Sequence, residues 1–494
     1  MSFRFYRCLP CVVIVVSAAL TGACSVTPPA EPDLPFVLPE HFSNTLVGHY
    51  TPVERWWSDF GDDQLNLFVE TALVGNPGLA QALARARVAE ARIRLNRADL
   101  LPQAGVGLNS ARQRQNMSAM AGPLGELADD MSFISNNHNA SLDVSWELDL
   151  WGRLAAISSA ARAEFLASAE QLRGARQSVA AQVVQLYYDI VHARAQVELS
   201  ERTVKALAEM SRQINNRVQA GIASPADAML AEANLGSARA GLEQRNEALA
   251  RTLRQLDILL GHYPSGALQT AEVLPGVPPA PATGVPAQLL ERRPDVRAAE
   301  LALLAAGYQL GAAERSFLPS LSLSGSAGYS SGEFSGLIDS NNLVWSIAGQ
   351  IMQPVFQGGR LIAQRDIAEG QQDEALHSYV ETALNALSEV ESLLAVDNVL
   401  TRRESSLDAS ASAAEKAVDV SFNRYLQGID PFLNVLESQQ RALDSRSAHI
   451  TARHARIENR IALHLALGGG FEQYPIAADQ PTHHDSLART ARQP

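Results

Sequence analysis

Two periodicities of apolar residues meet at Trp151-Gly152-Arg153. Before this point apolar and polar residues alternate strictly, which predicts a strand with one apolar face and one polar face. The apolar residues are Ala140, Leu142, Val144, Trp146, Leu148 and Leu150, and the polar ones are Ser141, Asp143, Ser145, Glu147 and Asp149. We expect the acids Asp143, Glu147 and Asp149 to share one wet face, where copies of the chain would repeat them as rings that favour cations.

Beyond this strand the apolar residues recur at alternating steps of four and three, a pattern typical of packed helices. No proline occurs between Arg153 and Val218. The pattern predicts a helix from Leu154 to Arg217, roughly 96 Å long at 1.5 Å per residue. The positions of this seam include Val179, Val183, Leu186, Ile190, Val197, Val204, Leu207, Ile214 and Val218.

The second half of the chain repeats this organisation. The spacing of 64 residues between Arg153 and Arg217 recurs between Arg360 and Arg424. Equal long spacings indicate a duplicated structural unit, which we place at residues 62–261 and 293–470. Further alternating segments occur near Ala104, Val106 and Leu108, at residues 320–329 and at residues 343–351.

Four strands of about ten residues are thus expected, long enough to cross a bilayer when tilted. Their polar faces carry mostly Ser, Gly, Gln or acid, and almost no Lys or Arg. This favours a membrane barrel with a wet lumen over a soluble sheet that covers a core. Four strands cannot close alone, so the pattern also predicts an oligomer.

The N-terminus reads as an export signal over residues 1–23. Arg4 and Arg7 precede an apolar run from Leu9 to Leu20, and Thr21-Gly22-Ala23-Cys24 follows. Small residues before a cysteine predict lipoprotein processing, which would leave a covalent lipid on Cys24. The alternative is ordinary cleavage that leaves Cys24 unmodified. All three cysteines precede residue 25, so no disulfide is expected in the mature body.

The remaining segments connect these elements. Residues 24–61 are predicted as an extended, lipid-anchored segment, and a helical pattern then runs to about Leu101 with an interruption at Asn76-Pro77. Residues 112–137 are predicted as a polar loop. The proline-rich residues 262–292 are predicted as a linker against the outside of the helices. Residues 471–494 are predicted as a disordered tail.

Each long helix is expected to end in a tight hairpin. Gly221 and Gly428 suit a left-handed position after a helix, and Ser224-Pro225 and Asp430-Pro431 read as a helix cap followed by a first-turn proline. Isoleucine follows each glycine, as Ile222 and Ile429. These two side chains either close the turns or form a docking surface for another protein.

Several function classes are disfavoured. A net charge of −13 argues against a nucleic-acid surface. Both lysines, Lys205 and Lys416, are followed by alanine, which excludes a P-loop. The segment Gly328–Gly332 has the Gly-x-Ser-x-Gly pattern of hydrolases but lacks the helix that this motif needs. His449 and His454 lie five residues apart, off one helical face, so no catalytic, cofactor or metal site is predicted.

These motifs resemble the TolC-like outer-membrane efflux family, and in particular its lipoprotein branch. The similarity covers most of the mature chain. It rests on Trp56-Trp57 with Phe60, Asn76-Pro77, the segment Trp146–Arg153, Arg292-Arg293-Pro294-Asp295, Phe317-Leu318-Pro319, Gln353-Pro354-Val355-Phe356 and Gly358-Gly359-Arg360.

The resemblance implies an α+β membrane protein of the Gram-negative outer membrane. Three subunits, each giving four strands, would form a twelve-stranded barrel continued by a helical barrel across the periplasm. An inner-membrane transporter, expected to be proton-driven, and a periplasmic adaptor would dock below. The residues expected at the adaptor-docking tips are Arg217, Gly221, Ile222, Arg424, Gly428 and Ile429.

The resemblance also implies a gate at the periplasmic tips. Asp227 and Tyr425 match positions that link neighbouring hairpins in the closed state. Asn434 and Glu437 match positions that carry a ring of acids, although Asn434 departs from an acid. Asp430 departs as well, where the family can place a basic gate residue. Simple capping by Asp227 and simple packing of Tyr425 remain alternatives.

The expected function is therefore a passive exit duct for drugs or other small toxic compounds. A protein-secretion duct of type I is the alternative, because it shares this architecture. A coiled-coil scaffold would not need wet-sided strands, and a nutrient porin would not need the long helices. A neighbouring gene for a proton-driven pump or for an ATP-driven exporter would separate efflux from secretion.

Overall fold

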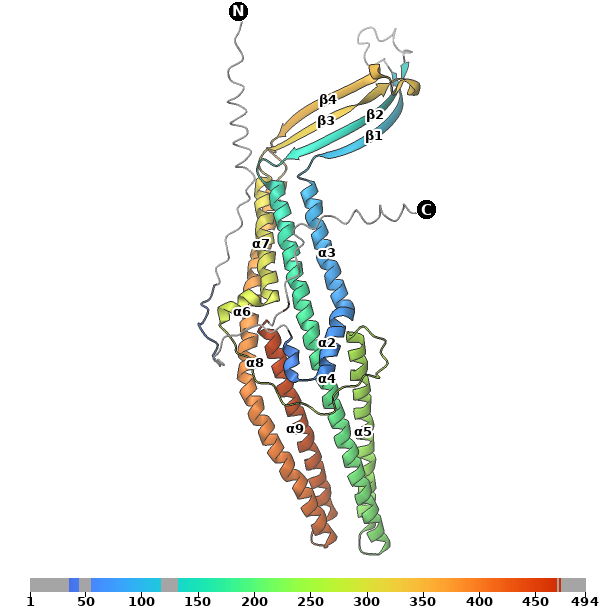
Figure 1. The fold of residues 1–494 in the computed structure, drawn as a ribbon, viewed down its shortest axis with the longest axis vertical. Helices are drawn as coiled ribbons and strands as arrows, with labels where there is room; N and C mark the ends of the chain where they lie inside the picture. The colour runs from blue at the N-terminus through green and yellow to red at the C-terminus, as the bar shows by residue number, and fades with distance from the viewer. Residues whose placement is uncertain (1–34, 44–54, 117–131, 469–470, 472–494) are drawn as a thin grey trace, which may run out of the picture. The chain divides into compact units, whose positions relative to one another are not determined.

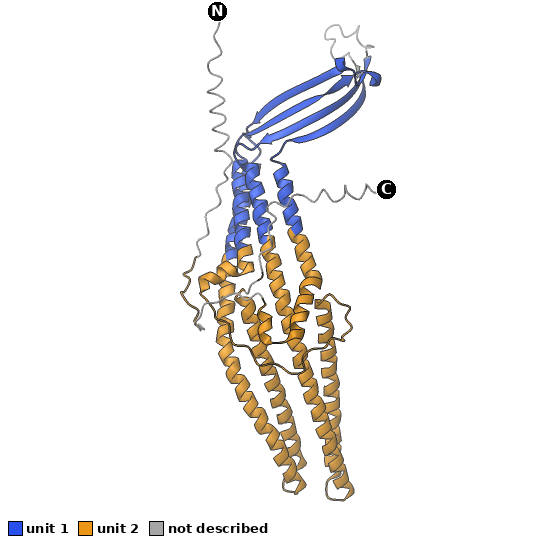
Figure 2. Ribbon diagram, viewed as in Figure 1, with its two compact units in different colours: residues 1–33, 87–167, 299–379 blue, residues 34–86, 168–298, 380–494 orange. Residues whose placement is uncertain are grey.

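The computed structural model describes residues 35–43, 55–116, 132–468 and 471. The described chain forms two compact units, each assembled from segments that are distant in sequence (Figure 2). The described residues within 87–167 and 299–379 belong to the first unit, and those within 34–86, 168–298 and 380–471 belong to the second. The predicted signal peptide, Cys24 and the tail beyond Phe471 lie outside the described residues.

The elements follow one another in two similar series (Figure 1). The first contains the 3₁₀ helix η1 (Trp56–Phe60), α2 (Asp63–Gly75), α3 (Pro77–Ala98), β1 (Gln103–Asn116), β2 (Ser132–Leu148), α4 (Arg153–Gln219) and α5 (Pro225–Leu259). The second contains α6 (Pro286–Arg292), α7 (Pro294–Arg315), β3 (Ser320–Ser331), η4 (Phe334–Gly336), η5 (Ser340–Asn342), β4 (Leu343–Met352), α8 (Arg360–Leu426) and α9 (Phe432–Ala466).

Matched helices of the two series have identical lengths. Both α3 and α7 contain 22 residues, both α4 and α8 contain 67, and both α5 and α9 contain 35. The predicted long helix is confirmed, with ends one and two residues beyond those expected. Because matched elements have the same length, the duplication inferred from residue spacings is present in the fold.

The strands form one antiparallel sheet in the order β1-β2-β3-β4. Its register aligns side chains of one kind across all four strands, because alternate residues of a strand face opposite sides. One apolar row is Val106, Leu142, Ala327 and Trp345, and the neighbouring polar row is Gly105, Asp143, Ser326 and Ser346. The apolar face is open: Val106 is 85 % exposed and Trp345 is 72 % exposed.

The limits of the first two strands differ from the prediction. β1 continues to Asn116 and β2 begins at Ser132, so both enter the segment expected to be a polar loop. β2 also ends at Leu148, which leaves Asp149 and Leu150 outside the strand. Backbone pairing across β1 and β2 extends the hairpin past the apolar residues, since strand pairing does not require an apolar side chain at each step.

The core of the second unit lies around the middle of α4. Val183, Ile190, Tyr187 and Tyr188 are fully buried or almost so. The interruption at Asn76 is confirmed: the Asn76 side chain accepts a hydrogen bond from Leu79 N at 3.0 Å and thereby caps the start of α3.

Part of the N-terminal segment is not extended, contrary to the prediction. Trp56, Trp57 and Phe60 form the buried face of η1 and join the core around α4. Three large aromatic side chains bury enough apolar surface to order a short helix.

The proline-rich linker lies along the helices, as predicted. Leu274 is 5 % exposed in the core, and Arg194 of α4 donates a hydrogen bond to Thr270 O at 2.8 Å. Its last residues form α6, which the sequence did not predict.

Phe471 was predicted to begin the disordered tail, but it is packed. Its ring stacks on Trp57 with 5.9 Å between the centroids, and Arg173 Nε donates a hydrogen bond to its carbonyl at 2.9 Å. Among the described helices, none has an apolar stretch long enough to cross a membrane.

Candidate functional site at the tips of the helical hairpins

The two helical hairpins turn in the same way, as predicted. Gly221 and Gly428 both have a φ of 74°, a left-handed conformation that glycine adopts without a steric penalty. Ile222 N then donates to Arg217 O at 2.9 Å, and Ile429 N donates to Arg424 O at 2.9 Å. These bonds satisfy carbonyls that the ending helices leave free.

The starts of the returning helices differ from each other. Ser224 caps α5 as predicted, since its hydroxyl accepts a hydrogen bond from Ala226 N at 3.2 Å. The predicted cap at Asp430 is wrong: Pro431 occupies the cap position of α9, and no side chain caps that helix. The Asp430 carboxylate is instead engaged by Arg424 within the turn.

The Arg424–Asp430 ion pair is bidentate. Arg424 Nε donates to Asp430 Oδ2 at 2.6 Å, and Arg424 Nη2 donates to Oδ1 at 3.2 Å. These hydrogen bonds hold the pKa of Asp430 below its usual value and raise that of Arg424. The pair spans the turn from the last helical residues of α8 to the start of α9, so it stiffens the second hairpin.

An apolar cluster joins the tips of both hairpins. Tyr425 and Phe432 lie at its centre, with 5.3 Å between their ring centroids. The buried members of this tip cluster are Met210, Ile214, Ala231, Tyr425, Phe432 and Val435. Helices from both repeats contribute, so the two hairpins of one chain hold each other at their ends.

The predicted gate residues Tyr425 and Asp227 are in direct contact. The Tyr425 hydroxyl donates a hydrogen bond to Asp227 Oδ2 at 3.1 Å, between the end of α8 and the first turn of α5. Burial, and next the hydrogen bond to Asp227, raise the pKa of Tyr425 to about 12. The phenol therefore stays protonated and remains a donor at physiological pH.

Arg217 lies over the same ring. Its guanidinium carbon is 5.8 Å from the Tyr425 ring centroid, which is a cation–π distance. Its Nε atom is buried and has no hydrogen-bond partner among the described residues. Arg217 was predicted as a docking residue, and in the structure it lies over Tyr425, one of the two predicted gate residues.

The structure does not bring the other two predicted gate residues to this pair. Asn434 and Glu437 lie on the exposed surface of α9, three residues apart. Both side chains face solvent in the single chain. A ring of these residues would need several copies of the chain.

The predicted docking isoleucines are exposed: Ile222 is 62 % exposed and Ile429 is 55 % exposed. Sequence reasoning missed three further apolar side chains near them. Met229, Leu230 and Leu433 are 74 %, 46 % and 56 % exposed. Their positions on the second turn of α5 and the first turn of α9, off the buried helical face, are the signal that could have identified them.

The three acids predicted for one wet strand face take three different roles. Asp143 lies on the polar face of β2, where Ser141 Oγ donates to its Oδ2 at 2.8 Å. Glu147 also lies on β2, but Arg153 Nη2 pairs with its Oε1 at 2.7 Å. Asp149 lies beyond the strand and accepts hydrogen bonds from Leu154 N at 3.1 Å and Ala155 N at 2.7 Å.

The expectation that all three acids share one strand face is wrong for Asp149, which lies beyond the end of β2. Asp149 caps the start of α4, because the first backbone N–H groups of a helix lack partners within the helix. Glu147 is neutralised locally by Arg153. Only Asp143 keeps the predicted character of an acid on the polar strand face without a described cationic partner.

Comparisons with known proteins agree with this architecture. The family model described as outer membrane efflux protein matches residues 68–262 and 285–469, one segment in each repeat. The outer membrane protein OprJ of Pseudomonas aeruginosa is 33% identical over 471 residues, which cover 94% of this chain and 96% of that protein. The cation efflux system protein CusC of Escherichia coli is 30% identical over 475 residues, which cover 94% of this chain and 100% of that protein.

The similarity extends to solved structures. The Campylobacter jejuni CmeC outer membrane channel aligns with a TM-score of 0.83 at 25% identity, over 91% of this chain and 96% of that one. The family model alone covers more than half of the sequence, and the duplicated helices and four strands are those of its solved members. This chain belongs to the outer membrane efflux protein family.

Proposed function

We propose that this chain is the outer-membrane channel subunit of a tripartite efflux system. In this role it is a passive exit duct for drugs or other small toxic compounds. The observation that carries the proposal is the sheet with one open apolar face and one polar face, joined to long paired helices of matched length. The apolar face suits lipid and the polar face suits a water-filled passage.

Three copies would complete the passage. β1 and β4 are the edges of the four-stranded sheet, and unpaired edges inside a bilayer are too costly to persist. A trimer would join these edges into a closed sheet of twelve strands, with the lipid on Cys24 as an additional anchor. The helical hairpins would then extend into the periplasm.

The hairpin tips are proposed as both gate and docking surface. A channel that stayed open would breach the outer membrane, so a closed resting state is required. The Tyr425–Asp227 hydrogen bond and the apolar tip cluster hold the hairpins together. The exposed Ile222 and Ile429 would receive a periplasmic adaptor, which couples the channel to a proton-driven transporter of the inner membrane.

Deletion of the gene in its own host tests this function. The deletion strain should become at least fourfold more sensitive to several unrelated toxic compounds, and the plasmid-borne gene should restore resistance. Unchanged sensitivity together with the loss of one secreted protein from the medium would instead identify a type I secretion duct.

A further inference from the structure

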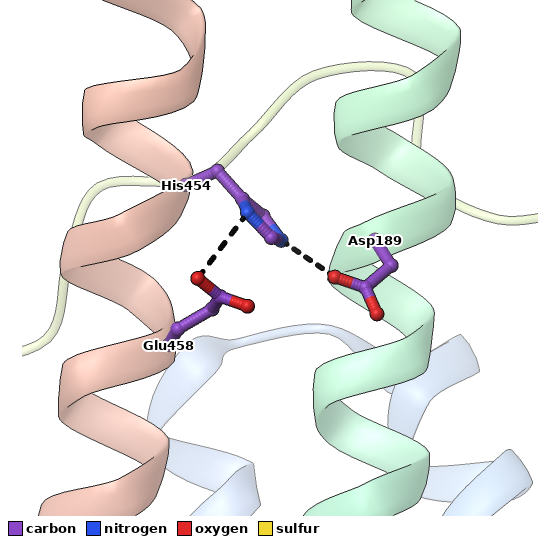
Figure 3. Close-up of side chains that lie close together, drawn as sticks. All are labelled: Asp189, His454 and Glu458. Carbon is purple, nitrogen blue, oxygen red and sulfur yellow. Dashed lines mark ion pairs between the residues drawn. The ribbon is translucent and has the colours of Figure 1, made fainter.

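A cluster of three metal-ligating side chains lies between the two repeats, within the second compact unit (Figure 3). Asp189 comes from α4, and His454 and Glu458 come from α9. One donor atom from each of the three lies within 4.8 Å of the other two. His454 and Glu458 are four residues apart, which places them on the same helical face.

His454 is buried and incompletely satisfied. It is only 7 % exposed, and its ring stacks on His192 with 4.6 Å between the centroids. Its Nε2 atom is 2.9 Å from Asp189 Oδ1 but forms no aligned hydrogen bond with any described residue. The imidazole thus has a carboxylate oxygen beside each ring nitrogen, Asp189 Oδ1 at Nε2 and Glu458 Oε2 at Nδ1.

The spacing of the donor atoms fits a bound ion. Two ligands at about 2.0–2.1 Å from a common metal ion are roughly 2.9–3.4 Å apart, depending on the angle between the bonds. The distance of 2.9 Å from His454 Nε2 to Asp189 Oδ1 lies in this range. Glu458 Oε2 lies beside the other ring nitrogen, 3.7 Å from His454 Nδ1, and its side chain, which is 40 % exposed, has to rotate to reach an ion bound at Nε2.

We propose that Asp189, His454 and Glu458 bind a divalent transition-metal ion, with Zn²⁺ as the best match. One imidazole and two carboxylates form a ligand set that suits Zn²⁺, and no thiolate or thioether is present to favour Cu⁺. Water would complete the coordination, since both carboxylates are partly exposed. The ion would cross-link α4 to α9 and so brace the first repeat against the second.

An entry path reaches the site. Asp189 lines a cavity of about 550 Å³ together with Asn76, Gln182 and Gln185. Leu186 and Ile258 line the same cavity, so solvent reaches the site on the side of Asp189.

The competing explanation for the cluster is a proton. A protonated His454 could hold one carboxylate near each ring nitrogen without any metal ion. The two explanations differ in their response to added Zn²⁺, because Zn²⁺ does not stabilise a cluster that is held by a protonated His454.

The test is a metal titration of the purified full-length trimer after treatment with a chelator. Wild type should bind one Zn²⁺ per chain by calorimetry, and Co²⁺ should produce a visible absorption band. Asp189→Asn, His454→Asn and Glu458→Gln should each weaken Zn²⁺ binding at least tenfold. Zn²⁺ should raise the unfolding temperature of wild type and not that of the variants.

Two controls separate the site from other histidines. His449→Asn removes a histidine that has a single carboxylate, Asp408, at 3.6 Å, and it should bind Zn²⁺ as wild type does. His483→Ala with His484→Ala removes the paired histidines of the tail and should do the same. The proposal is wrong if wild type binds no Zn²⁺, or if the three site variants bind it as tightly as wild type.

Discussion

The Tyr425 hydroxyl donates a hydrogen bond to the Asp227 carboxylate at 3.1 Å and so ties the two hairpins of one chain together. The pair lies beside the buried tip cluster, and the Arg217 guanidinium covers the Tyr425 ring. In the proposed gate this bond would act as a latch, because it breaks only when the hairpins part.

Removal of this latch should open the channel. We expect Asp227→Ala combined with Tyr425→Phe to raise the resting conductance in planar bilayers and the sensitivity of cells to large antibiotics. Trimer yield should not change, because the phenylalanine ring preserves the packing and the lost hydrogen bond contributes about 1 kcal/mol. Asp419→Ala, at an exposed acid of α8, is the control. A double variant that assembles and stays closed would place the gate elsewhere.

The exposed isoleucines of the tips should be needed for docking. Ile222→Asp with Ile429→Asp should abolish cross-linking to the adaptor and the resistance that the channel confers. Each side chain is more than half exposed, so the trimer should still assemble. Replacement of both by valine keeps the surface apolar and should preserve both readouts. Normal cross-linking of the aspartate variant would exclude these side chains from the docking surface.

Asp143 and Asp149 should differ in their effect on ion selectivity. Asp143→Asn should lower the preference for cations, measured as the reversal potential in unequal salt, because Asp143 lies on the polar strand face. Asp149→Ala should leave selectivity unchanged but cost about 1 kcal/mol of stability through the lost cap of α4. Wild-type selectivity for anions, or equal effects of the two variants, would contradict this assignment.

His464 should make the protein sensitive to acid. Burial, and next the charge of Arg460, lower the pKa of His464 to about 4. The unfolded chain binds this proton near pH 6.5 and the folded chain does not. The free energy of unfolding is therefore unaffected by His464 above pH 6.5. It falls as the pH drops from 6.5 toward 4, by up to about 1.4 kcal/mol per pH unit.

The variant His464→Phe should flatten this dependence. Phenylalanine keeps the stacking on Trp56, whose ring is 5.1 Å from that of His464, and it does not titrate. Unfolding of the detergent-solubilised protein, followed by tryptophan fluorescence between pH 7 and pH 4, would show the difference. His377→Gln, at an exposed histidine, should keep the wild-type slope. Equal slopes for His464→Phe and wild type would rule out His464 as the source.

Cys24 should carry lipid. Metabolic labelling with a fatty acid should mark the wild-type protein and not the Cys24→Ser variant. Transport could survive the substitution, because the sheet would still hold the protein in the membrane. Equal labelling of both proteins would show that Cys24 carries no lipid.

The sequence by itself determined the elements of this protein and their duplication. Periods of two and of three to four residues report which side of a strand or helix is apolar, and this property is local. The long helix from Arg153 and the glycine turns at Gly221 and Gly428 were therefore predicted almost to the residue. The Tyr425–Asp227 contact followed only from the family resemblance, since periodicity does not pair residues 198 positions apart.

Only the tertiary structure decided the partners of the polar side chains. A carboxylate binds whichever donor the fold brings within about 3 Å, so Asp149 became a helix cap, Glu147 an ion-pair partner and Asp430 a brace of its turn. The Asp189–His454 pair is the clearest case. These residues lie on helices of different repeats, and no spacing along the chain could bring them together, because the packing of α4 against α9 alone sets their distance.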